Sequence, residues 1–184
     1  EAHDEGIPCW DKDLSRYVYS SYIASYHPFH LYMDELPAWD GRDRLTALAL
    51  RVSCRPLWVQ GFHTWMLGLA SQWMDQSVLH ANSVAPILVS REQGRRKSTF
   101  CRSLMPDVLM RYYTDNLKLT SQGQAERLLA EMGLLNMDEF DKYAENKMPL
   151  LKNLMQMSAL NIRKAYQQNF RQLPRVASFI GTSN

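Results

Sequence analysis

The feature that most constrains the fold of this chain is a change of hydrophobic pattern near residue 83. Before it, residues 62–78 carry apolar side chains at three- and four-residue spacing, which is typical of an amphipathic helix. After it, residues 84–89 (VAPILV) form a short apolar run with β-branched members, which is typical of a buried strand. We therefore expect an N-terminal helical subdomain over residues 1–82 and a different unit over residues 83–184.

Strand and helix patterns alternate along the second unit. Further strands are expected at residues 134–137, 162–166 and 176–180. Helices are expected at residues 17–26, 43–52, 62–78, 99–105, 122–132 and 148–157. Strands that alternate with helices predict an α/β fold with a mostly parallel sheet.

Composition excludes several classes of protein. The 184 residues, 46% of them hydrophobic, can bury a core, and a net charge of +2 excludes a polybasic DNA-coating protein. The three cysteines form no CxxC pair and the five histidines no metal-ligand spacing, so we expect no disulfide framework and ordinary histidines. No apolar run approaches the roughly 20 residues of a membrane span, and no signal peptide opens the chain. These features predict a cytoplasmic location. Because residue 1 is glutamate, we also expect a piece of a longer protein.

A basic, glycine-containing segment follows the first predicted strand. Residues 93–98 (QGRRKS) place Lys97 and Ser98 where a GxxxxGK[ST] phosphate-binding loop has its Lys and hydroxyl residue. The full pattern would have glycine at positions 91 and 96, where this chain has Arg91 and Arg96. Taken alone, the segment fits a phosphate-binding loop and an ordinary basic helix start about equally well.

Two adjacent carboxylates end the next buried-strand run. In a nucleotide-hydrolysing protein, Asp138 would support magnesium and Glu139 would activate the attacking water. The alternative is an acidic pair of the kind common at strand ends. The order of the two motifs favours a nucleotide-binding function. A strand that leads into a Lys-Ser turn comes first, and a strand that ends in Asp-Glu follows about forty residues later.

The last predicted strand leads to Asn184. Ligands of open α/β sheets lie at the carboxyl ends of the strands, so Asn184 could orient the attacking water or touch the γ-phosphate. The alternative is a simple loop asparagine.

The C-terminal region is basic. Residues 148–184 contain no Asp or Glu, and their cations are Lys152, Arg163, Lys164, Arg171 and Arg175. Tyr166, Phe170 and Phe179 are interleaved with them, and residues 162–175 could form a hairpin with a polar tip. Single-stranded nucleic acid binding, arginine fingers that reach a neighbouring subunit's nucleotide, and a solvated basic face remain equally open.

These residues resemble the virulence-associated E (VirE) family of P-loop ATPases from phages, plasmids and integrated elements. The family is related to superfamily 3 helicases and is found with primase domains. The resemblance begins near residue 28 and is carried by residues 28–45 (PFHLYMDELPAWDGRDRL), 88–100 (LVSREQGRRKSTF), 134–142 (LLNMDEFDK) and 150–184. The last segment is the most specific, with Lys152, Arg163, Tyr166, Arg175 and Asn184 in register.

The resemblance implies a P-loop NTPase (RecA/AAA+-like) sheet core that binds ATP and Mg²⁺. Lys97 would contact the β- and γ-phosphates, and Ser98 would ligate magnesium. Asp138 would hold that magnesium through water, Glu139 would be the catalytic base and Asn184 the polar sensor. The loop around the nucleotide would be formed by Gln93, Gly94, Arg95, Arg96, Lys97, Ser98 and Thr99. The hairpin over residues 163–175, with Arg163, Lys164, Tyr166, Arg171 and Arg175, would contact DNA or supply the arginine finger.

The function expected from these features is ATP hydrolysis that drives work on single- or double-stranded DNA during replication of a mobile element. A primase and a homo-oligomeric ring are the expected partners. Turnover is expected to be weak, because the glycines are missing and the core stops at the sensor asparagine. If position 96 requires a left-handed backbone, Arg96 costs ~1–2 kcal/mol. The alternatives are a non-hydrolysing nucleotide- or DNA-binding module that regulates a primase, and a structural scaffold.

Overall fold

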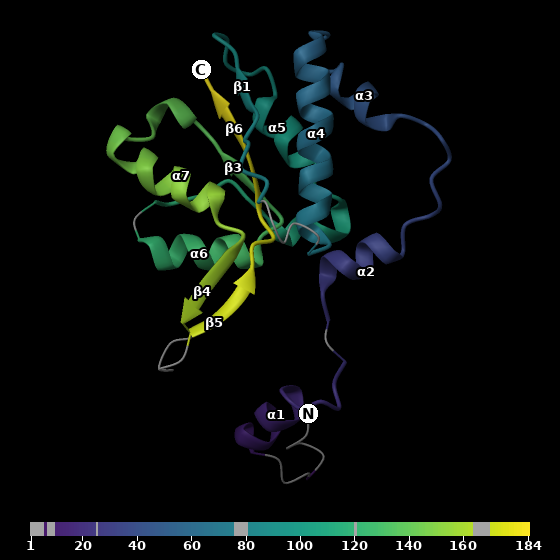
Figure 1. Cartoon of the computed structure of the whole chain (residues 1–184), viewed down its shortest axis with the longest axis vertical. Coiled ribbons are helices and arrows are strands. Elements are labelled where there is room, and N and C mark those ends of the chain that lie inside the picture. The colour runs from purple at the N-terminus through teal and green to yellow at the C-terminus, as the bar shows by residue number, and fades with distance from the viewer. Residues whose placement is uncertain (1–5, 7–9, 25, 76–80, 120, 164–169) are drawn as a thin grey trace.

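The protein contains a four-stranded parallel sheet with helices on both of its faces. A computed structural model of the chain describes residues 6, 10–24, 26–75, 81–119, 121–163 and 170–184. The sheet has the order β1-β6-β3-β2, and every neighbouring pair is parallel (Figure 1). Its strands are β1 (Ile87–Val89), β6 (Ser178–Ser183), β3 (Leu134–Met137) and β2 (Tyr113–Thr114). The predicted mixed α/β fold with a mostly parallel sheet is thereby confirmed.

Helices connect and cover these strands. The α-helices are α1 (Asp11–Val18), α2 (Pro28–Asp34), α3 (Arg44–Ala49), α4 (Pro56–Trp73), α5 (Lys97–Ser103), α6 (Gln122–Glu131) and α7 (Met148–Gln156). Three short 3-10 helices are η1 (Asp107–Tyr112), η2 (Phe140–Lys142) and η3 (Glu145–Lys147). Within the part of the chain that the structure describes, no helix is both long enough and apolar enough to cross a lipid bilayer.

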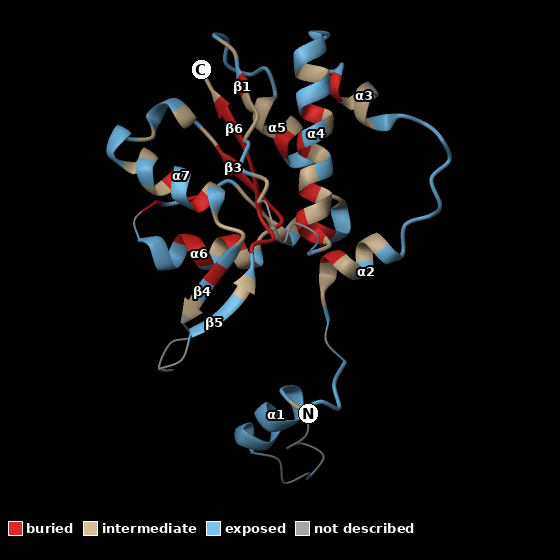
Figure 2. Cartoon of the chain, in the orientation of Figure 1, coloured by how far each residue is buried: buried red, intermediate tan, exposed pale blue. Residues whose placement is uncertain are grey.

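Each face of the sheet packs on its own hydrophobic cluster. Leu134 and Ile180 belong to the cluster that contains α4, whereas Leu135 and Phe179 belong to the cluster that contains α6 and α7. Successive side chains of a strand point to opposite faces, and β3 and most of β6 are buried on both faces (Figure 2). The burial extends to the polar residues Asn136, Ser178 and Thr182.

The helices before residue 83 and the sheet after it share a core. Phe62, Trp65 and Leu69 of α4 lie in the same buried cluster as Leu134 and Ile180 of the sheet. The expected division at residues 82 and 83 is therefore not a division in packing, because α4 covers one face of the sheet. In contrast, α1 buries none of its residues and lies apart from the other elements (Figures 1 and 2).

Several element boundaries differ from those expected. The expected helix over residues 17–26 is replaced by α1, which ends at Val18, and by α2, which the pattern missed. Proline begins both α2 and α4, because a proline in the first helical turn loses no backbone hydrogen bond. The end expected for α4 at residue 78 lies outside the described residues.

An antiparallel strand pair lies outside the main sheet. Strands β4 (Ala159–Arg163) and β5 (Phe170–Pro174) pair from Ala159 with Pro174 to Arg163 with Phe170. This pairing agrees with the predicted hairpin, although β4 begins three residues earlier than the strand expected at 162–166. The predicted polar tip covers residues 167–170; residues 167–169 lie outside the described part of the chain, and Phe170 is the first residue of β5.

Candidate functional site

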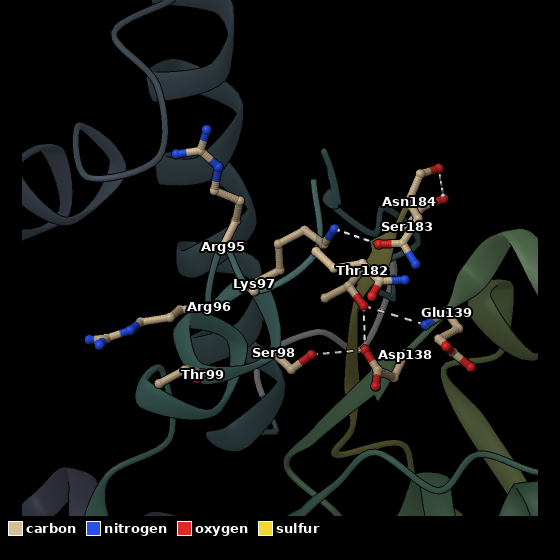
Figure 3. Close-up of a pocket in the computed structure, with 12 residues that line it drawn as sticks. Arg95, Arg96, Lys97, Ser98, Thr99, Asp138, Glu139, Thr182, Ser183 and Asn184 are labelled. Carbon is tan, nitrogen blue, oxygen red and sulfur yellow. Dashed lines mark hydrogen bonds between the residues drawn. The ribbon is translucent and has the colours of Figure 1, made fainter. Parts of the chain in front are cut away.

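Polar residues from three parallel strands meet at one edge of the sheet. Strands β1, β3 and β6 are neighbours, so the segments that follow their carboxyl ends lie together. They enclose a pocket of about 350 Å³. The pocket is lined by Gln93, Gly94, Arg95, Arg96, Lys97, Ser98, Thr99, Asp138, Glu139, Thr182, Ser183 and Asn184 (Figure 3). All the residues predicted for nucleotide, metal and catalysis therefore line a single pocket.

The loop between β1 and α5 contains two residues with a left-handed backbone conformation. Gly94 has φ 76°, and Arg96, directly before α5, has φ 57° and ψ 30°. Glycine takes this conformation without steric cost, whereas a left-handed arginine costs ~1–2 kcal/mol. Position 96 therefore does require a left-handed backbone, and the energetic cost expected for an arginine there applies. The side chains of Arg95 and Arg96 point away from Lys97 and Asn184 (Figure 3).

Lys97 is the pocket-lining cation whose side chain points toward Asn184 (Figure 3). It is the first residue of α5, and its Nζ donates to Asn184 Oδ1 at 2.9 Å and to the carbonyl oxygen of Ser90 at 3.3 Å. Lys97 and Asn184 are 87 residues apart in the chain. The ammonium group is thus held across the mouth of the pocket by two neutral oxygens, which a more negative ligand could replace.

Asp138 links the loop to the last strand. One of its oxygens, Oδ1, accepts hydrogen bonds from Ser98 Oγ at 2.9 Å and from Thr182 Oγ1 (Figure 3). The Thr182 hydroxyl also accepts the backbone N–H of Glu139 at 3.4 Å. Thr182 was not predicted from the sequence; its place two residues before Asn184, at the end of β6, is the signal that could have found it.

Glu139 is turned toward Lys142 in this conformation. Its backbone is left-handed, with φ 50°, and its Oε1 accepts a hydrogen bond from Lys142 Nζ at 2.6 Å. The carboxylate points away from Lys97 (Figure 3). The pair is largely exposed, and exposed ion pairs are weak, so the Glu139 side chain can leave this position at small cost.

Asp141 anchors the end of β6. Its Oδ1 accepts the Ser183 hydroxyl at 3.1 Å and the backbone N–H of Asn184 at 3.3 Å. The N–H of Asn184 is the main reason that the pKa of the Asp141 carboxyl lies below its usual value. Asp141 was not predicted either, because nothing in its spacing distinguishes it from a surface aspartate.

A buried cysteine of α5, Cys101, lies within the electrostatic influence of Asp138. Cys101 is fully buried, and its burial, followed by the charge of Asp138, raises the pKa of its thiol to about 12. A thiol with so high a pKa stays protonated at neutral pH, and only the thiolate is an effective nucleophile. Cys101 is therefore a packing residue of the site.

Arg175 corrects one of the predictions made for the basic segment. Only 1% of this residue is exposed. Its Nη1 donates to the carbonyl oxygens of Leu154 and Met155, at 3.0 and 2.6 Å, and its Nη2 donates to Gln72 Oε1 and the Asn82 carbonyl, at 3.1 and 2.8 Å. Burial lowers the pKa of this guanidinium to about 10. A group enclosed in this way cannot reach DNA or a neighbouring nucleotide, so its role here is structural.

Two other candidates of the basic segment, Arg163 and Arg171, lie on the antiparallel strand pair. Arg171 is an exposed residue of β5, and Arg163 is the last residue of β4. Lys164 and Tyr166 lie outside the described residues. Contact of this segment with DNA therefore stays a prediction.

The chemistry of the pocket suits an anion together with a hard divalent cation. Lys97 supplies a positive charge, and Ser98 and Asp138 supply oxygens 2.9 Å apart. Magnesium prefers oxygen ligands and is usually held by one or two carboxylates together with phosphate oxygens. Ser98 and Asp138 therefore fit a magnesium site beside a phosphate group that Lys97 would bind.

Comparison with known families agrees with the resemblance seen in the sequence. Residues 33–184 match the family described as virulence-associated protein E-like domain. The match covers most of the chain and includes every residue that lines the pocket, so the chain belongs to this family. No curated protein matches the chain.

Proposed function

We propose that this chain is the core of a P-loop ATPase that binds ATP with Mg²⁺ in the pocket at the carboxyl edge of its sheet. The observation that carries the proposal is the convergence of Lys97 with Ser98 and Asp138 on one cavity. Asp138 lies 40 positions after Ser98 in the chain, yet the three residues would supply a phosphate-binding cation and two magnesium ligands side by side. The RecA/AAA+-like fold belongs to the same proposal.

Each residue then has a defined task. Bound ATP would place its β- and γ-phosphates at Lys97, which gives up its hydrogen bond to Asn184. Ser98 and Asp138 hold the magnesium ion, which neutralises the phosphate charge. Asn184, released from Lys97, is free to orient the attacking water.

Glu139 would accept a proton from that water. In this conformation its carboxylate is held by Lys142. A general base must lie within hydrogen-bond reach of the proton it takes, so Glu139 must turn from Lys142 toward the pocket during turnover. Catalytic hydrogen bonds often form only in the substrate complex, so the position of Glu139 beside Lys142 is compatible with this role.

The work that hydrolysis would drive follows from the family. Virulence-associated E-like membership suggests a phage- or plasmid-associated protein. We propose helicase-like action on DNA during replication of such an element, with a primase and a homo-oligomeric ring as partners. The exposed Arg171, with Arg163, Lys164 and Tyr166, is the proposed contact for DNA or for a neighbouring nucleotide.

The test is ATP turnover with and without single-stranded DNA. Lys97→Ala is expected to abolish turnover, because it removes the cation that holds the phosphates. The matched control is Lys12→Ala, which removes an exposed lysine of α1 outside the pocket and outside the family-matched residues, and should leave turnover unchanged. Turnover that persists in Lys97→Ala would refute the assignment.

A second candidate is a non-hydrolysing nucleotide-binding module that regulates a partner. Two observations favour it: Arg96 occupies a left-handed position that suits glycine, and Glu139 is paired with Lys142. Calorimetric titration with Mg–ATP separates the candidates when it is followed by a turnover assay. Tight binding without product supports the second candidate, and product that disappears in Glu139→Gln supports the first. A structural scaffold predicts no binding at all.

A further inference from the structure

Two histidines and an aspartate form a cluster at the C-terminal end of α4. His27 is the residue before α2, His30 lies in its first turn, and Asp75 follows the last residues of α4. One ligand atom from each residue lies within 4.8 Å of the others, and His30 Nε2 is 3.4 Å from Asp75 Oδ2. The histidines and the aspartate are distant in sequence, so the spacing of the histidines alone gave no sign of the cluster.

The backbone around the cluster is fixed by the core. Phe29, between the two histidines, is 2% exposed, and its ring lies 4.9 Å from the ring of Trp73, two residues before Asp75. The Trp73 indole N–H donates to the carbonyl oxygen of Gly133 at 3.2 Å. Both sides of the cluster are therefore anchored by buried aromatic residues, which is the support that a metal site requires.

Asp75 occupies a position that suits an aspartate poorly. It follows an 18-residue helix, where the negative end of the helix dipole disfavours a carboxylate. Its φ is 52°, a left-handed conformation that glycine or asparagine usually supplies at a helix end. A bound cation would compensate the charge at this helix end. The position of Asp75 is thus an observation independent of the clustering that points to a cation.

The histidines are suited to be ligands. Metal ions bind the neutral imidazole ring through Nδ1 or Nε2. The His30 Nε2 atom is buried and makes no hydrogen bond, although Asp75 Oδ2 lies 3.4 Å away. The backbone N–H of His30 donates to His27 Nδ1 at 3.3 Å. Metal ligation through His27 Nδ1 would replace this long hydrogen bond.

We propose that His27, His30 and Asp75 bind a zinc ion. Zinc is held by imidazole nitrogens and carboxylate oxygens at about 2.0–2.2 Å, which places the ligands of a tetrahedral site about 3.4 Å apart. The separation of 3.4 Å between His30 Nε2 and Asp75 Oδ2 fits this arrangement. Three protein ligands leave a fourth position for water. The ion would fasten His27 and His30, which precede the family-matched residues 33–184, to the end of α4.

The test is metal binding by the chelator-treated 184-residue chain. Calorimetric titration with Zn²⁺ is expected to give one site, and Co²⁺ in its place should give the visible absorption of a tetrahedral site. Asp75→Asn keeps the size and the tolerance for a left-handed backbone but loses the charge, so it should weaken zinc binding more than about tenfold. His30→Ala should do the same, whereas His63→Gln, on α4 outside the cluster, should not.

Two results would overturn the proposal: no stoichiometric Zn²⁺ binding by the native chain, or binding that Asp75→Asn and His30→Ala leave unchanged. Circular dichroism of both variants shows whether they remain folded, and Asp75→Asn decides the matter if His30→Ala does not fold. The site is independent of the proposed ATPase function, since neither titration contains nucleotide.

Discussion

The two ends of strand β6 carry polar clusters of opposite character. At the start, Arg175 and Ser178 are buried, and the partners of Arg175 are Gln72 and backbone carbonyl oxygens. At the far end, Thr182 and Asn184 face an open pocket with Lys97 and Asp138. The start of the strand is closed to solvent and its hydrogen bonds join groups of the protein. The far end opens onto a pocket.

This difference separates a structural cluster from a binding site. Buried polar groups must find hydrogen-bond partners within the protein, and both terminal nitrogens of Arg175 do so. The pocket brings a cation and carboxylates together around empty space, where an added anion and metal can join their hydrogen bonds.

The largest effect is expected at the closed end. Arg175→Met keeps the aliphatic stem but leaves the carbonyl oxygens of Leu154, Met155 and Asn82 without their donor. Unsatisfied buried acceptors cost ~1–3 kcal/mol each, so the free energy of unfolding should fall by about 3 kcal/mol. Urea denaturation followed by circular dichroism measures the loss.

The control for this change is Arg171→Met, at an exposed position of β5. Its effect on stability should stay within about 0.5 kcal/mol. If Arg175→Met is as harmless as this control, the closed cluster does not have the structural role assigned to it here.

A smaller effect is expected at the anchor of the open end. Asp141→Ala removes the acceptor that fixes Ser183 and the backbone of Asn184. A displaced catalytic group slows reaction, so kcat for ATP should fall about tenfold while KM changes less. The exposed Asp115→Ala serves as the control, and an equal response of the two variants would show that Asp141 does not position Asn184.

The pH dependence of this anchor has a defined sign. The pKa of Asp141 lies below its ordinary value of 3.8, so the folded protein favours the carboxylate form. Its contribution to stability is therefore present above pH 3.8 and is lost as the pH falls through the lower folded-state pKa. An NMR titration of the Asn184 amide signal should follow this loss, and Asp141→Ala should abolish it.

The smallest effect is expected in the loop. Arg96→Gly relieves the left-handed arginine and should raise the free energy of unfolding by up to ~1 kcal/mol, since the greater freedom of glycine in the unfolded chain offsets part of the gain. Arg95→Gly, at a neighbouring position without positive φ, should lower it instead. Chemical denaturation of the two variants side by side checks the sign of each change.

Much of the sheet could be predicted because its signals are local. The boundaries of β3 are as expected, since its apolar run is bounded by Gly133 and Asp138. For β6 the pattern placed the strand at residues 176–180, whereas it covers Ser178–Ser183. Pairing with β1 extends the strand through polar residues. At Gly181, a Cβ atom would lie 2.7 Å from the Ile87 side chain, so the absence of a side chain permits this close approach.

The remainder depended on contacts between distant residues. Spacing placed Lys97 at the start of a helix and Asp138 and Asn184 directly after strands, as the structure also has them, but the same reasoning made Arg175 a surface group. Burial of an arginine is decided by partners such as Gln72, 103 positions away, which no local pattern reveals. Asp141 was missed for the same reason, whereas the place of Thr182 at the end of β6, two residues before Asn184, is a local signal that could have found it.

The most direct test of the central claim is equilibrium binding of an ATP analogue that is not hydrolysed, with magnesium and with EDTA. If Lys97 binds phosphate and Asp138 holds magnesium on the same ligand, Lys97→Ala should weaken binding under both conditions, and Asp138→Ala should weaken it only with magnesium. The double variant in magnesium should lose less than the sum of the two single losses. Unchanged affinity in Lys97→Ala, or a loss in Asp138→Ala that does not depend on magnesium, would contradict the account.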